Sequence, residues 1–316
     1  MSVPGHSRDA CQSAKHDGMP AIAAGHPYGL KAYAAAFAST ATPLCLPASG
    51  TWVLERAIPG HDGADVAGCH PRTPLADHAS LTADLDFLAA RGDVSAVFAV
   101  DVFTHPGLDV LEKMFDIARP FKTHYLRAPA PTLALGSHHR YMVKRARQAC
   151  EVAFVPLTGH LDTWCALYAT LADRRGISGA QAFSRTYFEC LATLPGLATA
   201  CAFDRGTPVA MHLWFEYQDK LYSHLAAASE RGYALSAPYA IHAFVCEHYR
   251  DRMIDLGGSA GNTDDPGGGL ARFKRGFASS ECPSFLCGKV LDARRYAAMA
   301  PPASAGSYFP AYRAPP

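Results

Sequence analysis

The chain lacks the features that would place it in several large classes of protein. No apolar run approaches the roughly 20 residues that a membrane-spanning helix needs. Residues 1–20 are polar and contain no apolar core of a secretory signal. Positive and negative charges nearly cancel, with 29 Lys and Arg against 28 Asp and Glu, so net charge indicates no polyanionic partner. We therefore expect a cytoplasmic protein without a membrane or DNA partner.

Two common signatures of catalysis are also missing, and a metal site finds little support. The sequence contains no Gly-x-x-x-x-Gly-Lys-Ser/Thr phosphate loop and no His-Glu-x-x-His zinc motif. Its ten cysteines are scattered, and Cys282 and Cys287 have no second Cys or His pair at zinc-finger distance. We expect reduced thiols, no bound metal and no tightly bound cofactor.

Length and composition bound the architecture. A chain of 316 residues with 49% apolar and 10% aromatic content can build one large or two medium domains with sizeable cores. Residues 1–25 and 300–316 are rich in Ala, Pro, Gly and Ser without periodicity, so we expect disordered tails there. The Ala/Pro stretch 128–136 predicts a linker between an N-terminal domain at 26–127 and a C-terminal domain at 137–299.

The N-terminal domain alternates helical and strand patterns. Leucines at helical spacing predict a helix at 81–91, and a β-branched and aromatic run predicts a strand at 95–103. The same patterns predict further helices at 28–37 and 109–118, and further strands at 51–56 and 122–126.

The C-terminal domain opens with a helix at 138–150, for which Ser137 is the expected N-cap. Two more helices precede three β runs at 199–203, 209–217 and 221–227. Because only short turns separate these runs, they must form an antiparallel meander. A helix at 237–249 can then supply the crossover to a strand at 253–256 that is parallel to the last run. A mixed sheet flanked by helices follows.

The stretch 253–277 is the most informative part of the chain. A short apolar strand leads into a loop so rich in glycine that its backbone can approach a ligand closely. The loop ends at Phe273-Lys274-Arg275-Gly276-Phe277, where cations stand between two aromatic residues. A strand that ends in glycines and is followed by fixed cations is a common way to build an anion or acyl site.

This order of elements resembles the GNAT acyltransferase superfamily, and more narrowly its FemAB-like branch, which pairs two GNAT domains. The residues that carry the resemblance are Ile254-Asp255-Leu256-Gly257-Gly258 and Gly269-Leu270-Ala271-Arg272-Phe273-Lys274-Arg275-Gly276-Phe277. They are similar to a D-x-G-G … G-L-x-x-F-K-x-G-F signature, and the basic segment 140–147 resembles the helix that opens the second GNAT domain.

The resemblance implies an α/β (α+β) fold of two GNAT-like domains, the first of them degenerate. Each domain would hold a mixed, mostly antiparallel sheet flanked by helices. The implied activity is transfer of an acyl or aminoacyl group to a small polar acceptor, with formation of an amide.

The acyl donor stays open between acyl-CoA and aminoacyl-tRNA. The usual pyrophosphate loop, Arg/Gln-x-x-Gly-x-Gly/Ala, is replaced at 228–234 by a segment with a single glycine, which leans away from CoA. The near-neutral charge, and the lack of an inserted helical hairpin of the kind that holds tRNA in some relatives, lean away from tRNA as a partner.

Three residues are candidate catalytic groups. The resemblance implies that Lys274 lines the acyl-donor channel and contacts phosphate or developing charge. Asp255 lies inside an apolar strand, so it is either a base with a raised pKa or, as we favour, an acceptor for loop N–H groups. His224 is a base or a substrate ligand, unless it is a satisfied core histidine.

Further candidates would bind the substrates. Tyr222 shares a strand face with His224, while His212, Trp214 and Glu216 share a face of the neighbouring strand, and the sequence does not fix which face lines the cleft. The other candidate binding residues are Arg140, Ser229, Arg231, Gly232, Gly257, Gly258, Arg272 and Phe273, with Arg275 an alternate to Lys274.

Two rival hypotheses belong to other functional classes. The first is a non-catalytic ligand-binding module that has kept the fold. The second is an RNA-binding protein that uses the basic stripe of helix 138–150, formed by Arg140, Lys144 and Arg147.

Overall fold

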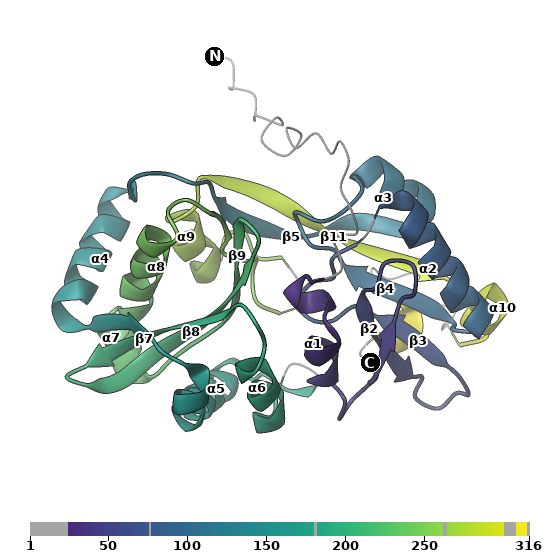
Figure 1. The fold of residues 1–316 in the computed structure, drawn as a ribbon, viewed down its shortest axis with the longest axis horizontal. Coiled ribbons are helices and arrows are strands. Elements are labelled where there is room, and N and C mark those ends of the chain that lie inside the picture. Colours follow the sequence, from purple (N-terminus) through teal and green to yellow (C-terminus); the bar gives the residue numbers. More distant parts are fainter. Residues whose placement is uncertain (1–24, 76, 180–181, 262–263, 300–307, 315–316) are drawn as a thin grey trace, which may run out of the picture.

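The computed structural model describes residues 25–75, 77–179, 182–261, 264–299 and 308–314. They form a mixed sheet of eleven strands with helices packed on both faces (Figure 1). In sheet order the strands are β1 (Thr42–Cys45), β2 (Trp52–Ala57), β3 (Ala64–Ala67), β4 (Ser95–Ala99), β11 (Ser280–Val290), β5 (Ile117–Arg127), β10 (Met253–Asp255), β9 (Lys220–Ala228), β8 (Thr207–Tyr217), β7 (Leu197–Asp204) and β6 (Glu151–Phe154).

The sheet is mostly antiparallel, as the sequence predicts. Strands β7, β8 and β9 form the expected meander, and the turns between them use Arg205, Gly206 and Gln218 at positive φ. Strand β10 returns parallel to β9 after a crossover through the helix α8 (Ala237–His248). In the first half, the ladder between β3 and β4 is also parallel. The mixed α/β fold class is confirmed.

Helices cover the two faces of the second half differently. Helices α4 (Ser137–Ala149), α7 (Glu230–Ala234), α8 and α9 (Gly269–Arg275) lie on one face, while α5 (Leu161–Arg175) and α6 (Arg185–Ala192) lie on the other, beside α1 (Lys31–Ala35). In the first half, α2 (His78–Arg91) and α3 (Leu108–Met114) pack on the sheet. Within the described residues the remaining elements are α10 (Ala293–Met299) and three short 3-10 turns, Pro27–Gly29, Leu157–His160 and Ala311–Arg313.

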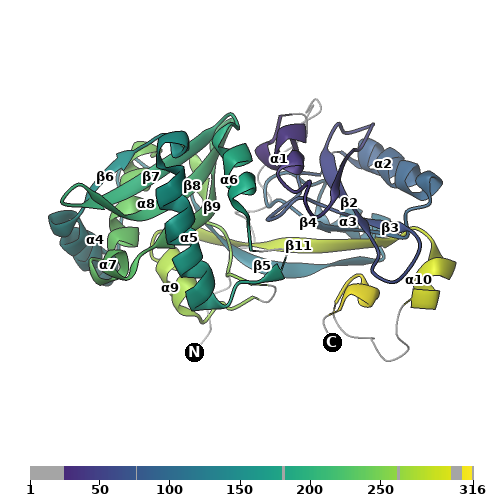
Figure 2. The ribbon, with the colours of Figure 1, turned by 90° about the horizontal axis from the view of Figure 1, so that it is seen from below.

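The last long strand joins the two halves. Although β11 follows the glycine-rich stretch 253–277 in sequence, it lies between β4 and β5 and pairs antiparallel with both. Figure 2 shows β5 and β11 running together across the middle of the molecule. The two halves therefore share one continuous sheet, where the sequence suggested two separate sheets.

Several local predictions need correction. Ser137 is the first residue of α4 and not its cap, because Gly136 occupies the N-cap position. The helix predicted at 109–118 ends at Met114, and β5 already begins at Ile117. Residues 1–24, 300–307 and 315–316 of the predicted tails lie outside the described residues.

Part of the predicted C-terminal tail is docked on the first half. Tyr312 donates a hydrogen bond to the buried carboxylate of Asp65 at 3.0 Å, and Arg313 forms an ion pair with the same group at 2.5 Å. The Phe309 ring packs over Gly288 of β11, where a side chain would collide with it. Residues 308–314 are thus held by specific contacts, which corrects the expectation of disorder there.

Candidate functional site

The candidate site lies where β9 and β10 separate. Strand β10 pairs with β9 only through Met253–Asp255, opposite Lys220–Tyr222, although β9 runs on to Ala228. Beyond Asp255 the chain follows β5 instead, since Leu256 N–H donates to the carbonyl of Tyr125 at 2.9 Å. It then turns at Gly257, whose φ of 78° is costly for any residue with a side chain.

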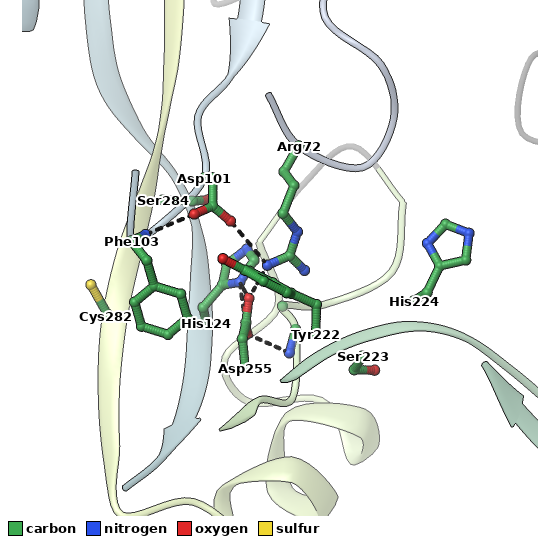
Figure 3. A network of polar contacts seen from close by, with 12 residues as sticks. Arg72, Asp101, Phe103, His124, Tyr222, Ser223, His224, Asp255, Cys282 and Ser284 are labelled. Atoms are coloured by element: carbon green, nitrogen blue, oxygen red, sulfur yellow. Dashed lines mark hydrogen bonds and ion pairs between the residues drawn. The ribbon is translucent and has the colours of Figure 1, made fainter. Parts of the chain in front are cut away.

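Asp255, at the end of β10, is fully buried and fully paired. Its carboxylate forms an ion pair with Arg72, contacts His124 Nδ1 at 2.9 Å and accepts the Gly257 N–H at 2.7 Å (Figure 3). Burial alone would raise the pKa of Asp255, but Arg72 and His124 outweigh it and hold that pKa well below its usual value. The raised pKa that a general base needs is therefore absent, and the favoured role as an acceptor for loop N–H groups matches the geometry.

Arg72 links the two halves at this point, and the sequence analysis missed it. It lies between Asp255 and the buried Asp101, whose Oδ2 is 3.5 Å from Arg72 Nη1. Its guanidinium also lies over the rings of Tyr222 and Tyr28, at 5.0 and 5.4 Å from their centroids. Arg72 stands in an irregular loop between two prolines, so no periodic pattern in the sequence marks it.

Lys274 contacts the turn at Gly257–Gly258 from helix α9. It lies on α9, is half-buried, and donates from Nζ to the carbonyl of Gly258 at 2.7 Å. A Cβ at Gly257 would lie 3.1 Å from Nζ, so the glycine permits this close approach. Burial lowers the pKa of Lys274 to about 8, although the charge of Asp255 opposes the shift. Lys122 of β5 holds the same loop by donating to the carbonyl of Ser259 at 2.9 Å.

His224 lies on the other face of β9, away from Lys274. Its Nδ1 is 3.3 Å from the hydroxyl of Tyr28 and its Nε2 is 3.0 Å from that of Tyr187. Tyr187 in turn contacts the hydroxyl of Tyr33 at 3.1 Å, and Tyr33 donates to the carbonyl of His70. Because a carbonyl only accepts, the chain of bonds has one direction: His224 Nε2–H donates to Tyr187, and Nδ1 accepts from Tyr28.

The predicted catalytic residues are therefore divided between two places. Asp255 and Lys274 lie together at the end of β10, whereas His224 belongs to the aromatic cluster between β9, α1 and α6. Burial lowers the pKa of His224 well below its usual value, so its imidazole is neutral. Tyr222 points to the same side as His224 and contacts His26 Nε2 at 3.2 Å. His212 and Trp214 point to the other side, toward α8.

The residues predicted to hold a pyrophosphate have structural partners. The Ser229 hydroxyl caps α7 by accepting the Gly232 N–H at 3.1 Å and donates to the carbonyl of Val209 at 3.1 Å. Arg231 forms an ion pair with Asp204 at 2.7 Å. Gly232 packs so closely on β8 that a Cβ would lie 2.2 Å from the Val209 oxygen. These contacts explain the three residues without a ligand, and their binding role stays a prediction.

The other predicted binding residues lie on α4 and α9. Arg140 donates to the carbonyl of Leu135 at 3.2 Å and, with Lys144 and Arg147, lines a shallow surface pocket of about 430 Å³. Arg147 is paired with Glu247 at 2.5 Å. The three candidates on α9 differ in their surroundings. Arg272 is exposed, and Arg275 pairs with Glu281 at 2.6 Å. The Phe273 ring instead packs inward on His242, with ring centroids 4.6 Å apart.

The loop Gly257–Gly261 matches the letters Gly-x-Ser-x-Gly, a spacing that the sequence analysis overlooked. That spacing marks a nucleophile elbow only where a strand turns directly into a helix. Here α9 begins only at Gly269, and the Ser259 hydroxyl donates to Asp264 at 2.9 Å. The match therefore marks a structural loop.

Comparison with known proteins relates part of the chain to a known family. Residues 137–275 match the family model of the acetyltransferase (GNAT) domain. This segment is similar to GNAT domains. The matched segment runs from the start of α4 to the end of α9 and so includes Asp255 and Lys274. No curated protein matches the sequence significantly.

Solved structures share the fold over most of the chain. FemX is 12% identical with a TM-score of 0.60, and the alignment covers 85% of this chain and 93% of FemX. L-PGS from Bacillus licheniformis is 12% identical with a TM-score of 0.57, covering 86% and 96%. The C-terminal DUF2156 domain of an Agrobacterium fabrum protein is 13% identical with a TM-score of 0.58, covering 81% and 85%. The resemblance to the GNAT superfamily and its FemAB-like branch is confirmed, for the latter at the level of the fold.

Among the described helices, none is long and apolar enough to span a lipid bilayer.

Proposed function

We propose that this protein is an acyltransferase that moves an acyl or aminoacyl group from a carrier to an amine of a small polar acceptor. The GNAT domain and the fold shared with FemX support this class of reaction. The observation that carries the proposal is Lys274, a half-buried cation directed at the Gly257–Gly258 turn where β9 and β10 separate.

The reaction assigns a clear task to that cation. The acceptor amine attacks the carbonyl carbon of the donor, a C–N bond forms, and the bond to the carrier sulfur or oxygen breaks. Negative charge develops on the carbonyl oxygen and then on the leaving group, while the amine loses a proton to solvent. A fixed cation in a water-poor site stabilises such charge strongly. Lys274 would meet it at the turn, and Asp255 would keep the turn in place through Gly257.

The neighbouring residues support this division of roles. Asp255 forms its ion pair with Arg72, and Lys274 donates to a neutral carbonyl oxygen instead. The charge of Lys274 therefore has no direct ion-pair partner in Asp255. His224 is neutral and uses both ring nitrogens in bonds to Tyr28 and Tyr187. We propose that it positions those tyrosines and does not take the amine proton itself.

The donor and the acceptor can be identified by one assay. The protein is incubated with radiolabelled acyl-CoAs and with charged tRNAs, each with a metabolite extract as the source of acceptors, with and without RNase. Transfer that RNase abolishes identifies aminoacyl-tRNA as the donor, and transfer that RNase does not affect identifies acyl-CoA. No transfer under any condition, together with a retained ligand detected by mass spectrometry, would overturn the proposal.

The assay also tests Lys274 directly. We expect Lys274→Met to lower kcat/KM by roughly 100-fold or more, the usual cost of removing one group that stabilises developing charge. Lys113 of α3 is exposed and distant in the fold, so Lys113→Met is the matched control and keeps wild-type activity. Equal activity of the two variants would contradict the role of Lys274.

A further inference from the structure

Three buried aromatic rings lie together between β8 and α8, and each carries a nitrogen that is unpaired among the described residues. His212 and Trp214 lie side by side on β8, with ring centroids 4.0 Å apart, and His242 of α8 packs 4.9 Å from His212. The side chains are 3%, 0% and 3% exposed. Among the described residues, His212 Nδ1, Trp214 Nε1 and His242 Nε2 find no hydrogen-bond partner. A buried polar atom left unpaired costs on the order of 1–3 kcal/mol, so three in one cluster indicate a missing group.

The hydrogen bonds that do exist fix what this missing group must offer. His242 Nδ1 lies 2.9 Å from the carbonyl of Pro238, which can only accept, so the ring proton is on Nδ1 and Nε2 is an acceptor. Trp214 Nε1 can only donate. His212 Nε2 shares a bond of 2.9 Å with the Ser223 hydroxyl, so its Nδ1 adapts to either role. A single group that satisfied all three nitrogens would have to both donate and accept.

The charges around the cluster restrict the chemical class of this group further. Burial keeps both imidazoles neutral by lowering the pKa of His242 to about 3 and that of His212 well below its usual value, and the charge of Lys274 lowers both further. The same charge repels a cationic ligand. A carboxylate offers no donor to His242 Nε2. A neutral amide or hydroxyl satisfies every requirement.

The position of the cluster connects it to the candidate site. Ser223 follows the last residue of β9 that pairs with β10, and its hydroxyl lies 4.0 Å from a Cβ placed on Gly257. Lys274 approaches the same point to 3.1 Å. We propose that His212, Trp214 and His242 form a subsite for a neutral amide or hydroxyl group of a substrate. Only the assignment of that group to the acyl donor or to the acceptor rests on the proposed function.

Nuclear magnetic resonance tests the subsite without any transfer reaction. The chain has three tryptophans, so indole ¹⁵N labelling gives three N–H signals in one spectrum. Acetamide, acetate and ethylammonium have similar sizes but differ in donor, acceptor and charge. We expect acetamide to shift the Trp214 signal in a saturable way, and acetate and ethylammonium to leave it in place.

Trp164 is the matched internal control. Its Nε1 is also buried and finds no partner in the part of the chain that the structure describes, but Trp164 lies on α5, across the sheet from Lys274. We expect its signal to stay unchanged. His242→Phe should weaken acetamide binding roughly 3- to 10-fold, the loss typical of one neutral hydrogen bond. If Trp214→Phe fails to fold, Trp52→Phe and Trp164→Phe assign the Trp214 signal by elimination.

The outcomes separate clearly. No shift at Trp214 would show that ordered water alone fills the site, and an equal shift at Trp164 would show that the effect of acetamide is nonspecific; either result would overturn the inference. A shift with acetate equal to that with acetamide would overturn the neutral class. Competition against acetamide then locates the source: displacement by pantetheine assigns the subsite to a CoA-type donor, and failure of pantetheine to displace acetamide excludes such a donor from it. Acetamide binding without any acyl transfer would leave the subsite standing while the proposed function fails.

Discussion

At the end of β10, two cations, Arg72 and Lys274, lie near the carboxylate of Asp255, and only Arg72 forms an ion pair with it. Arg72 pairs with Asp255, whereas Lys274 donates to a neutral carbonyl oxygen of Gly258. A half-buried ammonium with a neutral partner keeps much of its desolvation cost, which explains its lowered pKa of about 8. The incompletely compensated ammonium therefore lies where it could stabilise a developing negative charge.

This cost gives a pH dependence of stability with a definite sign. Between about pH 8, the pKa of Lys274 in the folded protein, and the ordinary lysine value of 10.5, the unfolded chain binds the proton and the folded chain does not. The contribution of Lys274 to the free energy of unfolding therefore rises with pH across this window. We expect the stability of wild type relative to Lys274→Met to increase from pH 8 to pH 10 in urea titrations. A difference that stays constant with pH would contradict the lowered pKa.

At the scale of the element, α7 shows how a segment that resembles part of a ligand motif also serves the packing. In this segment Ser229 caps the helix and Gly232 lies against the carbonyl of Val209 on β8. The glycine that resembles part of a pyrophosphate loop is thus required by the contact between helix and strand. The same residue type serves both tasks because each needs backbone atoms at close range.

Replacement of this glycine has a predictable cost. In Gly232→Ala the new Cβ would lie 2.2 Å from the Val209 oxygen, so the helix must shift. We expect a loss of about 1–3 kcal/mol in the free energy of unfolding. At Gly136 a new Cβ would meet no atom within 4 Å and the φ is negative, so Gly136→Ala should stay within about 0.5 kcal/mol of wild type. Equal stabilities by urea denaturation would show that α7 does not need its close packing.

At the scale of the whole molecule, the two halves depend on each other. Strand β11 lies between β4 and β5, and β5 lies between β11 and β10. A cut at the linker would leave β10 and β11 without β5, with open edges and exposed core residues. The buried Arg72–Asp255 pair would also be broken, which leaves an uncompensated charge on each side.

We therefore expect that residues 137–316 alone do not fold. Circular dichroism should show no cooperative thermal transition for this fragment, and co-expression with residues 1–136 should restore one. A fragment 137–316 that melts cooperatively by itself would contradict the shared sheet. The test matters for function, because Lys274 and Asp255 belong to the second half while Arg72 belongs to the first.

The sequence by itself determined the parts that local physics controls. The meander β7–β9 follows from short turns, the parallel β10 from the length of α8, and the glycine turn with Lys274 from its unusual composition. The resemblance placed Lys274 and Asp255 in one segment. The position of β11, the pairing of Asp255 with Arg72 and the separation of His224 from Lys274 were decided by tertiary structure alone. These arrangements depend on residues far apart in the chain, and no local pattern encodes which distant partner a buried charge or a central strand will find.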